Sequence, residues 1–75
     1  MEQQNENKLA YEIANTLNDQ KSITIHLSFV KRYKPEFLKE ILLRVMSIPD
    51  NKIRRSRAAL YTYLVNEHGR NHSRD

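Results

Sequence analysis

The sequence predicts an all-α protein, a small compact bundle of four helices joined by short turns. Three observations predict this fold. Large apolar residues recur at the three- and four-residue spacing of a helix along most of the chain. Residues that interrupt helices are rare, because the 75 residues include one glycine and two prolines. A chain of this length suffices for one domain, and the absence of cysteine excludes disulfides.

The predicted boundaries follow the apolar stripes and the helix breakers between them. The helices are expected over residues 6–17, 22–34, 35–48 and 51–68. They form a single helical domain, 6–69, between flexible polar tails at 1–5 and 70–75. The stripe of the first helix is made by Leu9, Ile13, Ala14 and Leu17. A turn at 18–20 ends that helix, and Ser22 is a suitable N-cap for the second.

The second helix is the ambiguous element, because residues 22–30 also show the alternation of a strand. Apolar side chains occupy every second position, at Ile23, Ile25, Leu27 and Phe29. A helix instead gathers one apolar face from Ile23, His26, Leu27, Phe29, Val30 and Tyr33. The helical interpretation accounts for Val30 and Tyr33, which the alternation does not. A lone strand would also lack a partner, so we predict a helix.

Proline marks the start of the third helix, because it restricts the residue before it and suits a first helical position. Pro35 therefore separates the second helix from the third. The apolar face of the third helix comprises Phe37, Leu38, Ile41, Leu42, Val45, Met46 and Ile48. Leu43 is the large apolar residue that points away from this face.

The fourth helix is predicted to follow a turn at 49–51, with Asp50 or Asn51 as its N-cap. Its core stripe comprises Ile53, Leu60, Tyr61, Leu64 and Val65. Gly69 follows the helix, where a left-handed C-cap is expected.

Charge is distributed unevenly along the chain, whose formal net charge is +4. Residues 1–20 carry four acids and one base, a balance of −3, whereas residues 21–75 carry twelve bases and five acids, a balance of +7. This asymmetry indicates a negatively charged partner, either a nucleic acid or an acidic protein surface, or a basic surface without a specific role. No apolar run is long enough to span a bilayer, and the acidic start is unlike a signal peptide. We expect a cytoplasmic protein without a membrane partner.

Signatures of catalysis are missing from the sequence. A single glycine cannot form a glycine-rich phosphate loop, and no cluster of further metal ligands flanks the histidines. His26 lies on the apolar face of its helix and is expected to be packed or partly exposed. His68 and His72 are assigned to a helix end and to the tail. We therefore predict no catalytic residue, no metal and no cofactor.

The segment 52–57 contains the strongest binding signal, four cations in the first two turns of the predicted last helix. Cations are mildly unfavourable there, because the helix dipole is already positive at that end. A bound anion reverses this balance, and arginine can hold a phosphate through two hydrogen bonds. The candidate nucleic-acid-binding residues are Lys52, Arg54, Arg55, Ser56, Arg57, Tyr63, Lys31, Arg32 and Lys34.

These candidates differ in how well a structural role explains them. Lys52 and Arg55 are predicted on the face away from the core, together with Ser56 and Tyr63. Arg54 and Arg57 fall near the core stripe, where they could instead pair with Asp50 or Glu40. The cations at 31–34 suit the end of the second helix, and they are expected to bind only if the fold brings them beside Lys52 and Arg55.

The third and fourth helices, with the tight link 47–51, can be interpreted as a helix-turn-helix whose second helix faces DNA. Residues 33–68 resemble the helical C-terminal region of bacterial replication initiator and helicase-loader proteins of the DnaD type. The resemblance lies in a helix, a short turn and a basic helix that ends in the aromatic and aliphatic pattern of residues 58–65. It implies DNA binding in replication.

Together these features predict a small basic nucleic-acid-binding protein, with DNA favoured over RNA, that contacts phosphates with little base specificity. The alternative is a protein-interaction module, either an adaptor, inhibitor or regulator. Such a module would bind an acidic partner, or would form a homodimer through Leu43 and the apolar face of the third helix.

Overall fold

The protein is a four-helix all-α bundle, as predicted. The computed structural model describes the backbone of residues 2–73 and the side chains of residues 7–73. The α-helices are α1 (Glu2–Thr16), α2 (Ile23–Arg32), α3 (Pro35–Ser47) and α4 (Arg57–His68). Three short 3-10 helices accompany them: η1 (Gln20–Ser22), η2 (Asp50–Lys52) and η3 (Gly69–His72). Residues 2–73 contain no strand, so the helical interpretation of residues 22–30 is confirmed.

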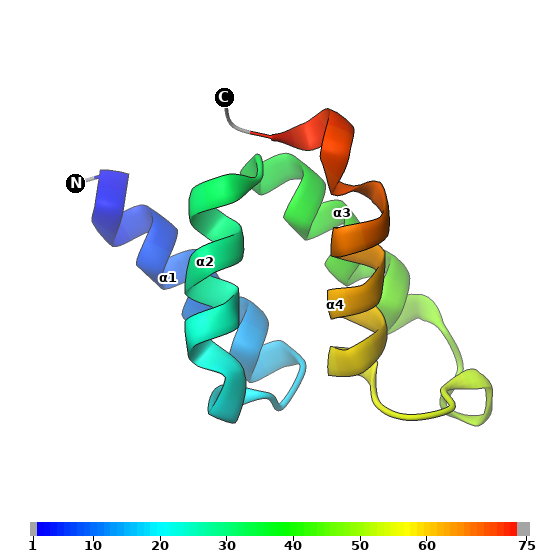
Figure 1. The fold of residues 1–75 in the computed structure, drawn as a ribbon. Helices are drawn as coiled ribbons and strands as arrows, with labels where there is room; N and C mark the ends of the chain where they lie inside the picture. Colours follow the sequence, from blue (N-terminus) through cyan, green and yellow to red (C-terminus); the bar gives the residue numbers. More distant parts are fainter. Residues whose placement is uncertain (1, 74–75) are drawn as a thin grey trace.

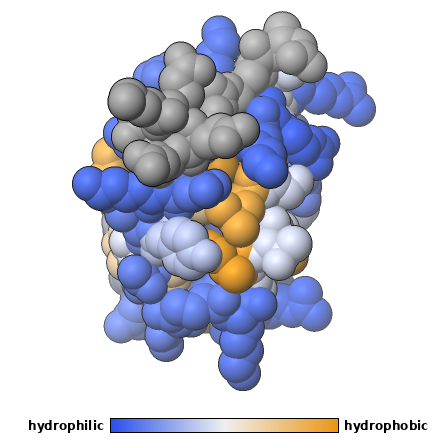
Figure 2. Space-filling view, turned by 90° about the vertical axis from the view of Figure 1, so that its left-hand side faces the viewer, coloured by the Kyte–Doolittle hydropathy of each residue, from blue (hydrophilic) through white to orange (hydrophobic). Residues whose placement is uncertain are grey.

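The helices form two packed pairs that share one core. α1 packs along α2, and α3 packs against α4, as Figure 1 shows. The core takes buried side chains from all four helices: Ala10, Ile13, Leu17, Phe29, Val30, Tyr33, Phe37, Leu38, Ile41, Val45, Tyr61 and Val65. The side of the molecule on which α1 lies is largely hydrophilic, with a narrow apolar strip among the polar residues (Figure 2). The predicted apolar stripes thus form the core, except that Met46 is 41% exposed and Ile53 lies ahead of α4, outside the core.

The junctions between the first three helices follow local chemistry. Asn18 follows α1 with a φ of 54°, the left-handed conformation that asparagine tolerates better than most residues. Ser22 is the N-cap of α2, although its side chain makes no capping hydrogen bond. Tyr33 and Lys34 are extended ahead of Pro35, which is the first residue of α3. α2 therefore ends at Arg32, two residues earlier than predicted.

The start of the last helix differs from the prediction. α4 begins at Arg57, and its N-cap is Ser56, whose Oγ accepts a hydrogen bond from the Ala59 amide at 3.0 Å. The expected caps, Asp50 and Asn51, instead belong to the short helix η2. Serine, aspartate and asparagine are all favourable N-caps, so capping propensity alone does not predict at which of them the helix begins. α3 and α4 are joined by residues 48–56, which is longer than the tight link of a helix-turn-helix.

The role of Gly69 also differs from the prediction. Its φ is −72°, so it is not a left-handed C-cap. A Cβ atom at this position would lie 2.8 Å from Cζ of the buried Tyr33 side chain. Glycine is needed here because the Tyr33 ring packs against the backbone, not because of an unusual backbone angle.

Most of the described residues of the two predicted tails lie in helical elements. Residues 2–5 belong to α1, and residues 69–72 form η3. The Lys34 amide donates to the His72 carbonyl at 2.9 Å, and the rings of Phe37 and His72 stack with centroids 4.3 Å apart. Residues 1 and 74–75 of the predicted tails lie outside the described part of the chain.

Candidate nucleic-acid interface

A hollow of about 370 Å³ lies between the segment that precedes α4 and the first turns of α4. We call it the first basic hollow. Its lining residues are Lys52, Ile53, Arg54, Arg55, Ser56, Ala59, Leu60 and Tyr63. Five of the nine predicted binding residues therefore come together, although four of these five precede the helix instead of lying on its face.

The three cations of the first basic hollow are free of acidic partners among the described side chains. Lys52, Arg54 and Arg55 are all exposed. In residues 7–73, the lysines and arginines that form ion pairs are Arg44, with Glu40, and Arg57, with Asp50. The free cations also lie just ahead of the positive end of the α4 dipole. The hollow is therefore lined by three cations that form no described ion pair.

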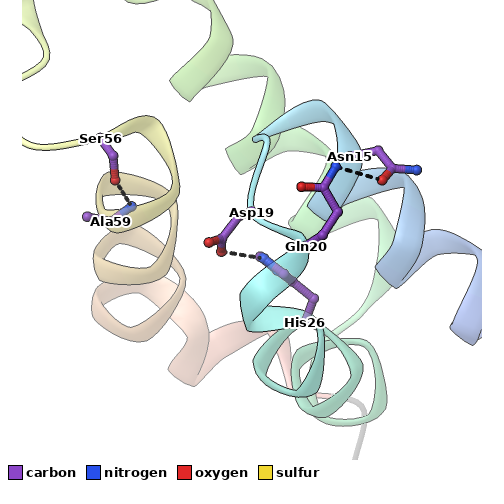
Figure 3. A network of polar contacts seen from close by, with 6 residues as sticks. All are labelled: Asn15, Asp19, Gln20, His26, Ser56 and Ala59. Atoms are coloured by element: carbon purple, nitrogen blue, oxygen red, sulfur yellow. Dashed lines mark hydrogen bonds and ion pairs between the residues drawn. The ribbon is translucent and has the colours of Figure 1, made fainter.

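Ser56 contributes to the hollow mainly through backbone geometry. Its hydroxyl oxygen accepts from the Ala59 amide, which fixes the first turn of α4 (Figure 3). A serine hydroxyl still has one proton to donate after accepting a hydrogen bond. Ser56 is therefore a structural cap that can also offer one donor to a ligand.

Arg57 has a structural role that separates it from the other candidates. Its Nη1 donates to the Val45 carbonyl at 2.6 Å, and its Nη2 donates to the Asp50 carboxylate. Val45 lies in the last turn of α3, so Arg57 ties the start of α4 to the end of α3. The alternative partner considered from the sequence, Glu40, pairs with Arg44 instead, at 3.9 Å.

The cations at 31–34 do not lie beside Lys52 and Arg55. Lys31 and Arg32 border a separate hollow of about 470 Å³, which we call the second basic hollow. Its lining residues are Lys31, Arg32, Tyr33, Asn66, Gly69, Arg70 and Ser73. Lys34 is exposed but lines neither hollow. Its described hydrogen bonds are made by its backbone, whose amide donates to the His72 carbonyl and whose carbonyl accepts from the Leu38 amide.

Sequence reasoning missed Arg70 as a member of this second basic hollow. The residue was assigned to a polar tail, because Gly69 was interpreted as the end of the folded domain. Its proximity to Lys31 and Arg32 depends on the packing of Tyr33 against Gly69, which joins the ends of α2 and α4. The guanidinium of Arg32 also lies 5.2 Å from the centroid of the Tyr33 ring.

One exposed face of α4 connects the two hollows. Ala59 and Tyr63 line the first, and Asn66 and Arg70 line the second. Ala59, Tyr63 and Asn66 are spaced by four and three positions, so they follow one side of α4. Arg70 lies four positions beyond Asn66, in η3. The distance between the ends of this stripe is roughly 16 Å along the axis. In Figure 1, α4 runs upright through the right half of the picture, with its first turn (yellow) at the bottom and its last turn (orange) at the top.

The buried polar groups lie elsewhere, in the core. His26 is buried, as expected for a packed histidine, and its Nε2 lies 3.0 Å from a carboxylate oxygen of Asp19 (Figure 3). The His26 ring packs 5.7 Å from that of Tyr61, centroid to centroid. Burial raises the pKa of the Tyr61 hydroxyl well above its ordinary value. These groups are enclosed by the core and open onto neither basic hollow.

The described residues hold no group of three or more histidine, aspartate or glutamate side chains placed to bind a metal ion. Within residues 2–73, no helix combines the length and apolarity needed to cross a membrane. No protein-family model matches the sequence, and no curated protein or solved structure matches it. The two hollows and the α4 face between them form the candidate site.

Proposed function

We propose that this protein binds nucleic acid through phosphate contacts made by Lys52, Arg54 and Arg55 at the first basic hollow. The observation that carries the proposal is the presence of two basic hollows at the two ends of one exposed α4 face. An extended polyanion can contact both hollows at once, whereas a small anion can occupy only one. DNA is favoured over RNA because of the resemblance of residues 33–68 to DnaD-type proteins.

Electrostatics support the same proposal. The three cations repel one another and face the positive end of α4, and no described acid compensates them. Each cation in such a position costs about 0.3–1 kcal/mol at low salt. A phosphate backbone removes this cost by adding negative charge at the helix start. Phosphate binding therefore accounts for the three unpaired cations ahead of α4.

The experiment is a fluorescence-anisotropy titration with double-stranded DNA, single-stranded DNA and RNA at low and moderate salt. We expect dissociation constants of roughly 1–100 μM, which rise steeply with salt because counterions are released. The double variant Lys52→Glu/Arg55→Glu should lose binding while its circular dichroism spectrum and melting temperature stay nearly unchanged.

A matched control reverses two exposed charges that line neither hollow, Lys8→Glu/Lys21→Glu. It changes the net charge by the same amount but leaves both hollows intact. An equal loss of binding in both double variants would show a general charge effect and no site. The absence of binding to all three nucleic acids at low salt would overturn the proposal.

One observation favours the alternative, a protein-interaction module. Leu43 is 69% exposed and Met46 is 41% exposed, and the two lie three residues apart on the outer side of α3. Phe37, Leu38, Ile41 and Val45 of the predicted apolar face of α3 are buried. Self-association through α3 would therefore have to use Leu43 and Met46. In this case Leu43→Glu should convert a dimer into a monomer in sedimentation velocity. Identical sedimentation of both proteins would exclude a dimer of this kind.

A further inference from the structure

The lining of the first basic hollow contains more than the groups that a phosphate requires. Ile53, Ala59 and Leu60 are half-buried there, and the Tyr63 ring stands beside them with 59% of the residue exposed. The three cations, in contrast, are exposed. The hollow therefore has an apolar floor, an aromatic wall and a charged rim. Phosphate oxygens are not stabilised by contact with apolar carbon. The apolar floor is therefore better suited to a less polar part of the ligand.

We propose that the first basic hollow receives an unpaired base of a single-stranded nucleic acid, while the rim cations hold the phosphates on either side of that base. This inference rests on the proposed function and specifies the strand that the site takes. A nucleobase is flat and largely apolar on its faces, so it can stack on the Tyr63 ring and cover Ile53 and Leu60. Arginine can add stacking as well as a two-point phosphate contact.

The size of the hollow suits this ligand. Its volume of about 370 Å³ is in the range of pockets that hold small organic molecules. A base within a duplex is stacked and paired, so it can enter such a hollow only after it has been flipped out of the helix. A single strand offers its bases without this cost. The geometry therefore favours single strands over duplexes of equal length.

The test separates base contacts from phosphate contacts. The protein is titrated with a labelled oligothymidine 12-mer, an abasic 12-mer with the same number of phosphates, and a 12-base-pair duplex at one salt concentration. We expect the oligothymidine to bind about tenfold more tightly than the abasic strand, an effect of the size that stacking of one base produces. It should also bind more tightly than the duplex.

Variants at Tyr63 assign the effect to the hollow. Tyr63→Ala should remove the difference between oligothymidine and the abasic strand and leave the salt dependence unchanged, because the phosphate contacts persist. Tyr63→Phe keeps the ring and should keep the difference. Tyr11→Ala is the matched control, because Tyr11 is 54% exposed on α1, away from both hollows. It should retain the wild-type preference.

The outcomes distinguish this inference from the proposed function. Equal affinity for oligothymidine and the abasic strand, or a preference for the duplex, would overturn the base site and leave phosphate binding intact. The base site would also be overturned if Tyr11→Ala reduced the difference in affinity between oligothymidine and the abasic strand as much as Tyr63→Ala does. Failure to bind any of the three oligonucleotides, together with tight binding of polyglutamate, would overturn both and assign the hollow to an acidic protein partner.

Discussion

Tyr61 and Tyr63 lie two positions apart on α4 but have opposite environments. Tyr61 is fully buried among the rings of His26 and Phe29, whereas Tyr63 is 59% exposed at the first basic hollow. Two positions on a helix correspond to a rotation of about 200°, so the two side chains point to opposite sides. The inner face of α4 serves the core, and the outer face is available to a ligand.

The same division applies to the arginines near the start of α4. Arg57 is drawn inward to the Val45 carbonyl, whereas Arg55 is exposed at the hollow without a described acidic partner. Both side chains carry the same guanidinium group, so residue type alone does not distinguish their roles. Their roles differ because the Arg57 guanidinium donates to a carbonyl in the last turn of α3. Substitutions on the two faces should therefore separate stability from binding.

The largest effect on stability is expected from Tyr61→Ala. Removal of a buried aromatic side chain costs about 3–5 kcal/mol, which approaches the whole stability of a domain of this size. Tyr63→Ala should change the free energy of unfolding by less than about 0.5 kcal/mol, because the side chain is exposed. Urea denaturation followed by circular dichroism measures both. Similar midpoints for the two variants would contradict the division of α4 into two faces.

Gly69→Ala should destabilise the protein by about 1–3 kcal/mol, because the added methyl group would collide with the Tyr33 ring. The backbone angles of Gly69 are acceptable for alanine, so backbone strain contributes nothing. Thermal unfolding of a double-mutant cycle with Tyr33→Leu tests the cause. The cost of Gly69→Ala should fall sharply when the ring is absent. An unchanged cost would show that the ring contact is not the reason for glycine.

Arg57→Ala should lower the free energy of unfolding by about 1–2 kcal/mol, because a charged donor to the end of α3 is lost. The pair with the exposed Asp50 adds little to this value. Arg55→Ala is the control and should leave stability unchanged while weakening nucleic-acid binding. Chemical denaturation and anisotropy on the same two proteins give the comparison. Loss of stability in Arg55→Ala would place that residue in the framework instead of the site.

The smallest effect is expected from Tyr61→Phe, and it depends on pH. Burial raises the pKa of the Tyr61 hydroxyl, and the hydroxyl has no hydrogen-bond partner among the described residues. At neutral pH its removal should therefore change stability by no more than about 1 kcal/mol. Above the ordinary tyrosine pKa of 10.0, the unfolded chain releases a proton that the folded chain retains.

The sign of the pH effect follows from this proton. Below pH 10 the tyrosine is protonated in both states, and its contribution to stability is fully present. As the pH rises above 10, the wild type should lose about 1.4 kcal/mol per pH unit relative to Tyr61→Phe. Melting temperatures of both proteins between pH 8 and 11 measure the difference. A constant difference over this range would argue against a buried, protonated hydroxyl.

Most of the fold could be predicted because it depends on local periodicity. For residues 22–34, helical spacing predicts Val30 and Tyr33 on the apolar face, which the strand alternation does not. Both side chains are buried in the core. The outward position of Leu43 followed in the same way. The sequence places Lys52, Arg54 and Arg55 in the first turns of the last helix, whereas in the structure all three lie ahead of α4.

The sequence by itself determined the four helices, most of the core stripes and the concentration of positive charge in residues 52–57. These properties arise from neighbours within one or two turns, which the order of residues already specifies. The tertiary structure decided where α4 begins, why residue 69 is glycine, and that Arg70 joins Lys31 and Arg32. Each of these depends on contacts between distant residues, such as Arg57 with Val45 and Gly69 with Tyr33, and no local pattern records them.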